Sequence, residues 1–322
     1  MKSKSSMVLA LLVALPVFGV PRIGVMPKLT GIDFFNAVER GAKMAGRELG
    51  VEVVYDGPVT NDVARQSALV ETWIAQKLDV ICVAPNDPAA IASVLRKARS
   101  RGIRVLTYDA DALPEARDLF VNQASASAVA MALIDSLARN VGSEARYLII
   151  TGSATAANQN IWMAEMEKYR AKAFPRMVNL SPTPKVTEED QALATQVAID
   201  SLKAYPDLQA MIAMTTVALP GAAEGLIKAG MAGKVFLTGI STPRSMRPYV
   251  KAGVVPEVVL WNPEDLGYLT VQVAVQLLRK TITVDAKEIM AGRLGARPIA
   301  NREVLLGDPL VFNKDNIDNY NF

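Results

Sequence analysis

The residues that could recognise a molecule gather where apolar segments give way to helical patterns. Residues 153–166 follow the apolar run YLIITG and begin with small polar side chains. They include three amides, Asn158, Gln159 and Asn160. Amide side chains donate and accept hydrogen bonds at once, but they are not acids or bases near neutral pH. This stretch therefore predicts a site that holds a neutral, hydroxyl-rich molecule without reacting with it.

Further candidate residues follow the ends of other predicted strands, where ligands bind in open parallel sheets. The carboxylate of Asp109 could accept hydrogen bonds from two hydroxyls, and Phe34 and Phe35 could stack on the apolar face of a sugar ring. The other candidates in such positions are Lys28, Asn158, Gln159, Thr215, Trp261 and Asn262. Each also has a structural interpretation as a core, capping or loop residue, so the prediction depends on their shared location.

Several classes of chemistry are excluded by composition. The chain has no histidine, which excludes Ser-His-Asp and Cys-His machinery and every metal site that needs histidine. The single cysteine, Cys82, lies in the apolar run DVICVAP and is expected to be buried. No glycine-rich phosphate loop is present, and a net charge of +3 does not indicate nucleic acid. We expect no catalytic residues, no metal and no cofactor.

Two conspicuous features are expected to be structural. Trp162 lies one helical turn beyond Asn158 and is interpreted as a core residue. The acidic run of Glu188, Glu189 and Asp190 is interpreted as the solvated start of a helix, where acidic side chains favour the helix dipole.

The elements that must position these residues alternate regularly between strand and helix. From Arg22 onward, apolar runs such as VEVVYDG, DVICVAPND and IRVLTYDAD are separated by segments with helical spacing. This alternation predicts an α/β fold with parallel sheets whose faces are covered by helices. The pattern repeats in a second half that begins near DLFVNQASAS. The segment from about Val258 to Lys280 resembles the first half, so we expect the chain to cross between the halves more than once.

The N-terminus has the pattern of a leader. Lys2 and Lys4 precede an apolar run from Met7 to Val20, which is too short for a comfortable membrane span of about 20 residues. It suits a secretory signal peptide over residues 1–21, although no A-x-A precedes Pro21. A buried N-terminal strand or helix is the alternative. No cysteine follows the run, so we expect an exported protein without a lipid anchor.

From Arg22 to Phe322 the chain resembles the sugar-binding periplasmic proteins of ABC importers, in the ribose-binding-like, type I group. The resemblance is carried by the order and spacing of PKLTGIDFFNAVERGAKMAGRELGVEVVYDGP, ANDPAAI, RGIRVLTYDAD, STPRSMRPYVKAG, LWNPEDLGYL and VFNKDNIDNYNF. Within this group it looks like the branch of rhamnose-binding and autoinducer-2-binding proteins. The chain resembles the autoinducer-2 proteins at Lys28, Asp109 and Gln159. Those proteins have an aspartate where this chain has Asn158, and Pro-Asp-Ala where this chain has residues 214–216.

The rhamnose-type proteins resemble the second half more closely, in ATAANQNIWMAEM, IAMTTV and LWNPEDLGYLTVQVA. The resemblance implies capture of a neutral sugar, rhamnose or a similar deoxyhexose, with autoinducer-2 or another sugar as alternatives. It implies two Rossmann-like lobes joined by a three-stranded hinge, a periplasmic monomer, and membrane permease subunits as partners. The implied lobes are residues 22–122 with 258–293, and residues 123–257 with 294–322.

Two other classes of function remain open from the sequence. The sensor core of a transcriptional repressor can share this fold, but it needs an N-terminal helix-turn-helix, and here an apolar leader occupies that place. A small sugar-active enzyme needs an acid and a base in one pocket. Asp109 and Lys28 could supply such a pair, and a turnover assay with candidate sugars would separate an enzyme from a binding protein.

Overall fold

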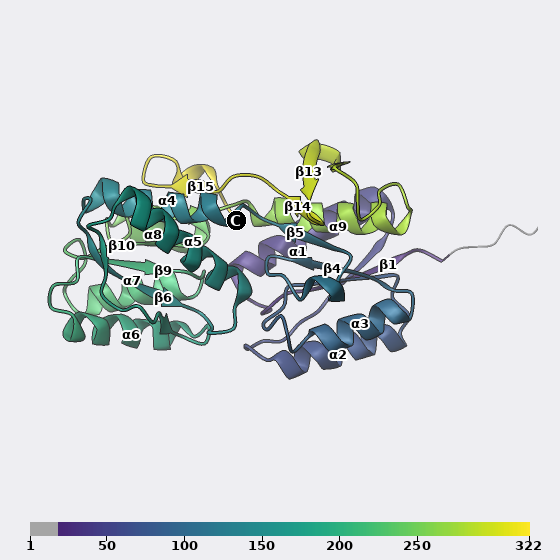
Figure 1. Cartoon of the computed structure of the whole chain (residues 1–322), viewed down its shortest axis with the longest axis horizontal. Helices are drawn as coiled ribbons and strands as arrows, with labels where there is room; N and C mark the ends of the chain where they lie inside the picture. The colour runs from purple at the N-terminus through teal and green to yellow at the C-terminus, as the bar shows by residue number, and fades with distance from the viewer. Residues whose placement is uncertain (1–18) are drawn as a thin grey trace, which may run out of the picture.

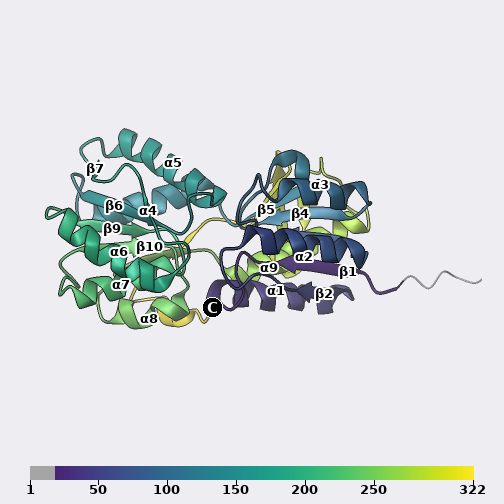
Figure 2. The same cartoon turned by 90° about the horizontal axis from the view of Figure 1, so that it is seen from below.

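The computed structural model describes residues 19–322, which form two α/β lobes side by side along the long axis of the molecule (Figure 1). The view turned by 90° shows only a few chain segments passing between the lobes (Figure 2). The predicted signal peptide lies outside the described residues, except for residues 19–21. Within residues 19–322, no helix combines the length and the apolar character needed to cross a membrane.

The first lobe contains an eight-stranded sheet with the order β12-β13-β14-β5-β4-β3-β1-β2. Its strands are β1 (Arg22–Met26), β2 (Glu52–Tyr55), β3 (Val80–Val83), β4 (Arg104–Tyr108), β5 (Leu119–Asn122), β12 (Glu288–Met290), β13 (Ala296–Ala300) and β14 (Glu303–Leu305). The pairs among β1 to β5 and the pair of β14 with β5 are parallel. Strands β12 and β13 continue this edge with antiparallel pairs.

Two pairs of helices cover the two faces of this sheet (Figure 1). They are α1 (Asp33–Leu49) with α9 (Pro263–Leu278), and α2 (Val63–Ala75) with α3 (Ala92–Ser100). Burial on both faces explains why the central strands are apolar throughout, as in β3, where every residue is buried. Helices α1 and α9 approach closely because Gly41 and Gly267 lie at their contact. A Cβ at Gly41 would overlap the backbone carbonyl of Glu264.

The second lobe contains a smaller parallel sheet with the order β10-β9-β6-β7, and β8 also pairs with β6. Its strands are β6 (Arg146–Thr151), β7 (Val178–Asn179), β8 (Lys185–Val186), β9 (Ala210–Ala213) and β10 (Phe236–Gly239). Helices α4 (Ala126–Asn140) and α5 (Ala157–Ala173) pack on one face, and α6 (Gln191–Ala204) and α7 (Ala218–Lys228) on the other (Figure 1). Helix α8 (Pro243–Lys251) packs beside α7.

Three crossings connect the lobes within the described residues. They follow β5, β11 (Val258–Leu260) and β14. Strand β11 pairs antiparallel with β15 (Leu310–Phe312), and a bridge between Ile240 and Val259 places this pair beside β10 in the second lobe. The α/β fold with two mostly parallel sheets is confirmed, and the repeated crossing agrees with the expected hinge.

The lobe boundaries expected from the sequence need two corrections. Residues 258–260 were assigned to the first lobe, but β11 pairs beside the second sheet. Residues 294–322 were assigned to the second lobe, but β13 and β14 complete the edge of the first sheet through the pairing of β14 with β5. Short strands have no sequence pattern that reveals which sheet they join when the deciding partner is distant in the chain, as β5 is for β14 and β15 is for β11.

Candidate functional site

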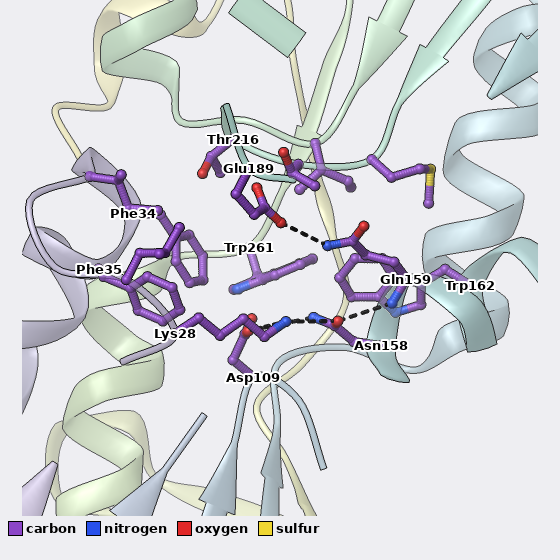
Figure 3. Close-up of a pocket in the computed structure, with 15 residues that line it drawn as sticks. Lys28, Phe34, Phe35, Asp109, Asn158, Gln159, Trp162, Glu189, Thr216 and Trp261 are labelled. Atoms are coloured by element: carbon purple, nitrogen blue, oxygen red, sulfur yellow. Dashed lines mark hydrogen bonds and ion pairs between the residues drawn. The ribbon is translucent and has the colours of Figure 1, made fainter. Parts of the chain in front are cut away.

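A cavity lies between the lobes, where the carboxyl ends of strands from both sheets face one another. The space among its lining side chains, including the part that is open to solvent, is about 430 Å³. Figure 3 shows its side chains converging from the two lobes and from the crossing after β11. Its lining residues are Lys28, Leu29, Ile32, Phe34, Phe35, Asp109, Asn158, Gln159, Trp162, Glu189, Met214, Thr215, Thr216, Ile240 and Trp261.

A buried polar cluster connects the two lobes across this cavity. Lys28 follows β1, and its Nζ lies 3.3 Å from Oδ2 of Asp109, which follows β4. The same Nζ donates to Oδ1 of Asn158 at 2.9 Å, and Nδ2 of Asn158 donates to Oδ2 of Asp109 at 3.4 Å. Asn158 lies in the first turn of α5, so an amide of the second lobe completes the ion pair of the first.

The carboxylate of Asp109 is held in an unusual environment. Its backbone has a φ of 61°, in the left-handed region that residues other than glycine seldom adopt. Burial raises the pKa of Asp109, and the ammonium group of Lys28 counteracts that rise. Backbone strain at a buried charged group is a recurring feature of functional sites.

Aromatic side chains form one wall of the cavity. The rings of Phe34 and Phe35 meet edge to face with centroids 4.9 Å apart, at the start of α1. The ring centroid of Trp261 lies 6.0 Å from that of Phe34 and 5.5 Å from that of Trp162. The indole Nε1 of Trp261 is buried and has no hydrogen-bond partner among residues 19–322. Because an unmade hydrogen bond at a buried donor is costly, this N–H is available to a ligand acceptor.

The second lobe contributes polar groups of fixed orientation. Oε1 of Gln159 accepts from Oγ1 of Thr151 at 2.5 Å and from the backbone N–H of Gly152 at 2.8 Å. Its Nε2 therefore faces Oε1 of Glu189, at 3.2 Å. Oγ1 of Thr215 accepts from the backbone N–H of Ala218 at 2.9 Å, and its hydroxyl donates to the carboxylate of Glu189.

Eight of the nine residues predicted from the sequence line the cavity, and one does not. The eight are Lys28, Phe34, Phe35, Asp109, Asn158, Gln159, Thr215 and Trp261. Asn262 is not among the lining residues. Its Oδ1 accepts from the backbone N–H groups of Glu264 and Asp265, so it caps α9. A cap and a ligand contact need the same residue type at the end of a strand, which is why the sequence did not separate them.

Sequence reasoning missed other members of the cavity wall. Trp162 is buried as expected, but it also lines the cavity. Glu189 was interpreted as part of a solvated helix start, whereas its side chain faces Gln159 inside the cavity. The strand before it, β8, has only two residues, so no apolar run marked this strand end. The other lining residues outside the nine candidates lie in the predicted strand-end segments and are Leu29, Ile32, Met214, Thr216 and Ile240.

The arrangement favours reversible hydrogen bonding over catalysis. Its ionisable groups are one ion pair and one further carboxylate, and the pair is already satisfied by Asn158. Within residues 19–322, no three side chains of the types that hold metal ions cluster together. What remains is an aromatic wall, apolar side chains, and donors and acceptors that face the enclosed space.

Comparisons with known proteins agree with this geometry. Residues 23–282 match the family model of the periplasmic binding protein domain. A D-ribose/D-allose-binding protein of Pseudomonas aeruginosa is 29% identical over 245 residues, which are 72% of this chain and 74% of that protein. Two solved structures are each 27% identical with a TM-score of 0.89 and cover 94% of this chain. One is LsrB from Clostridium saccharobutylicum in complex with AI-2, covered over 100% of its length. The other is an ABC transporter solute-binding protein from Clostridium phytofermentas with bound L-rhamnose, covered over 98%.

Proposed function

The chain belongs to the periplasmic binding protein family, among its sugar-binding members, and on that premise we propose that it captures a neutral sugar between its lobes and delivers it to an ABC importer. One observation carries the sugar assignment. The cavity combines an aromatic wall with buried hydrogen-bonding groups, and the indole N–H of Trp261 lacks a partner in the part of the chain that the structure describes. A ring with an apolar face and hydroxyls at its edges matches both features. Because relatives of this family bind sugars for transport, we assign no reaction to the chain.

Capture proceeds by closure of the lobes around the ligand. Hydrogen bonds already connect the two lobes. Asn158 accepts from Lys28 and donates to Asp109. Oγ1 of Thr155 donates to the backbone oxygen of Asn86 at 3.2 Å. The crossings between the lobes provide the hinge. The closed pair of lobes then presents one continuous surface, which the permease subunits of an importer can distinguish from the open form.

Among sugars, we propose rhamnose or a similar deoxyhexose. Asn158 accepts from Lys28 with one side-chain atom and donates to Asp109 with the other. An ionised aspartate at this position, as in the autoinducer-2 proteins that the sequence resembles, could not donate to Asp109. The apolar residues Met214 and Ile240 also line the cavity and offer contacts for a methyl group. AI-2 is the alternative, supported by Lys28, Asp109 and Gln159.

The site assignment extends to all eight lining residues predicted from the sequence. We propose that Asp109, Asn158 and Gln159 bind hydroxyls, with Lys28 and Thr215 in support, and that Phe34, Phe35 and Trp261 cover the ring. We further propose that residues 1–21 are a signal peptide and that the mature protein acts as a periplasmic monomer. N-terminal sequencing of the protein recovered from the periplasm should begin near Pro21 or Arg22.

A thermal-shift screen of the mature protein tests the proposal. The panel contains L-rhamnose, other deoxyhexoses, pentoses, polyols and AI-2, without borate. A ligand at a thousandfold excess over its Kd adds about 4 kcal/mol of stability. The largest shift is expected with rhamnose. A largest shift with AI-2 would reject the deoxyhexose, and no shift with any sugar would reject sugar capture.

Titration calorimetry of Asp109→Asn then tests the site. Affinity should fall by one to two orders of magnitude, because charge-assisted hydrogen bonds contribute about 1.5–3 kcal/mol each. Asp200→Asn, on the outer surface of α6, is the matched control and should bind as the wild type does. Unchanged affinity in Asp109→Asn would exclude its ligand role.

A further inference from the structure

Glu189 lies in a turn whose backbone is held in an unfavourable conformation. Glu188 and Glu189 have φ angles of 49° and 56°, both in the left-handed region. Such residues persist only where the surrounding structure fixes them, and they concentrate at functional sites. Here the backbone N–H and Oγ1 of Thr187 both bind the carbonyl oxygen of Thr151. On the other side, Asp190 caps α6 by accepting from the backbone N–H of Leu193. The turn is thus fixed at both ends, and it directs Glu189 into the cavity.

The packing around this carboxylate depends on a glycine. Gly152 follows β6 directly beneath the side chain of Glu189, and a Cβ at Gly152 would overlap Oε1 of Glu189. The same Cβ would come within 2.8 Å of Cγ2 of Thr215. The glycine therefore makes the space in which the Glu189 carboxylate sits.

Glu189 lacks the ionic partner that Asp109 has. Among the described residues, no lysine or arginine forms a salt bridge with it, whereas Lys28 lies 3.3 Å from Asp109. Its Oε1 accepts from Nε2 of Gln159 at 3.2 Å, and a hydrogen bond from Thr215 also favours its ionised form. Burial nevertheless raises the pKa of Glu189. The charge of Lys28 across the cavity lowers this pKa, and that of Asp109 raises it. A carboxylate can accept about four hydrogen bonds, so Glu189 has unused acceptor capacity facing the cavity.

We propose that Glu189 determines ligand specificity by accepting hydrogen bonds from hydroxyls of the bound sugar. This inference rests on the proposed function and assigns Glu189 the part in the second lobe that Asp109 has in the first. Figure 3 shows the two carboxylates converging on the space in front of Trp261 from the two lobes. The ligand must therefore present hydroxyl groups toward both lobes. With one lysine and two carboxylates, the cavity also repels ligands with an acidic group, such as uronic acids and sugar phosphates.

The variant Glu189→Gln tests this role because it keeps the shape of the side chain and removes the charge. With the sugar that gives the largest thermal shift, its affinity should be at least tenfold weaker in titration calorimetry. The melting temperature of the unliganded variant should equal or exceed that of the wild type, since a partly buried carboxylate without an ionic partner is removed. Glu188→Gln is the matched control. Glu188 is exposed and outside the cavity lining, and a glutamine oxygen can still accept its hydrogen bond from Asn61. Its affinity should stay within twofold of the wild type.

Three results would overturn the proposal. Wild-type affinity in Glu189→Gln would show that the carboxylate does not contact the ligand. A lower melting temperature of unliganded Glu189→Gln would indicate a structural role instead. Tight binding of glucuronate or a hexose phosphate by the wild type would contradict the charge argument. If the wild type binds no sugar of the panel, the proposed function itself fails, and this inference fails with it. That outcome is distinguishable because it appears before any variant is made.

Discussion

Replacing Lys28 by methionine tests the electrostatic balance of the cavity. Nζ of Lys28 lies 3.3 Å from Oδ2 of Asp109, and both side chains are buried. Two opposite unit charges at this separation attract by about 5 kcal/mol at an effective dielectric constant of about 20. Removing one partner of a buried pair costs about 3–5 kcal/mol, because the other charge stays buried and unpaired. We therefore expect Lys28→Met to lower the free energy of unfolding at pH 7 by about 3 kcal/mol.

The loss in Lys28→Met should depend on pH. Burial already raises the pKa of Asp109, and the ammonium group of Lys28 holds that rise back. Without Lys28, the pKa of Asp109 in the folded protein rises further above its value in the unfolded chain. The folded state then binds the proton more tightly than the unfolded state, so stability is regained as the pH falls through the folded pKa. Urea denaturation should therefore show a smaller loss at pH 5 than at pH 7.

The double variant Lys28→Met/Asp109→Asn is the control, because it removes both charges and leaves a neutral cluster. It should recover most of the stability lost in the single variant and should lack its additional pH dependence. The electrostatic reasoning is refuted if Lys28→Met loses the same stability at both pH values. It is also refuted if the double variant is no more stable than Lys28→Met at pH 7.

Three further substitutions test separate parts of the structure. Trp261→Phe removes the unpartnered indole N–H, and calorimetry should show sugar affinity about tenfold weaker, as for one hydrogen bond of about 1–1.5 kcal/mol; unchanged affinity would mean that no ligand atom accepts from it. Gly152→Ala displaces the flexible end of Glu189, so affinity should fall as it does in Glu189→Gln while the melting temperature changes little; wild-type affinity would argue against a fixed carboxylate. Gly41→Ala forces α1 away from the carbonyl of Glu264 in α9, and overpacking should cost about 1–3 kcal/mol in urea denaturation without changing the ligand preference; wild-type stability would show that these helices separate freely.

The sequence predicted the fold well because the dominant pattern is a long alternation of apolar strands and amphipathic helices. Strands buried on both faces must be apolar, and the residues that follow them must lie at one edge of the sheet. This geometry brought Lys28 and Asp109 together although they lie in different βα units. It also placed Asn158 opposite them, from a second sheet that no local pattern connects to the first.

The failures occurred where local pattern carries little information. Strand β8 has two residues, so Glu189 followed no recognisable strand, and its acidic neighbours suggested a solvated helix start. Strand β14 pairs with β5, far away in the chain, and β13 joins the same sheet through its local pairing with β14, so their lobe could not be read from their own composition. An asparagine after a strand, such as Asn262, is typical both of a ligand-binding residue and of a helix cap. In the structure its side chain accepts hydrogen bonds from backbone N–H groups of α9, so it is a cap.

The distribution of satisfied and unsatisfied groups explains why closure should depend on a ligand. The first lobe contributes Lys28 and Asp109, whose charges compensate each other and are completed by Asn158 when the lobes meet. By contrast, the N–H of Trp261 and the spare acceptor capacity of Glu189 stay unmatched in the closed protein. Trp261 lies in a crossing between the lobes and Glu189 in the second lobe, so one sugar reaches both together with Asp109 only when the lobes are closed. A ligand shifts a conformational equilibrium only by its difference in affinity for the two states. Trp261 and Glu189 provide the difference in ligand affinity between the open and closed states. The ion pair of Lys28 and Asp109 adds little to this difference, because Asn158 already satisfies the pair without the ligand.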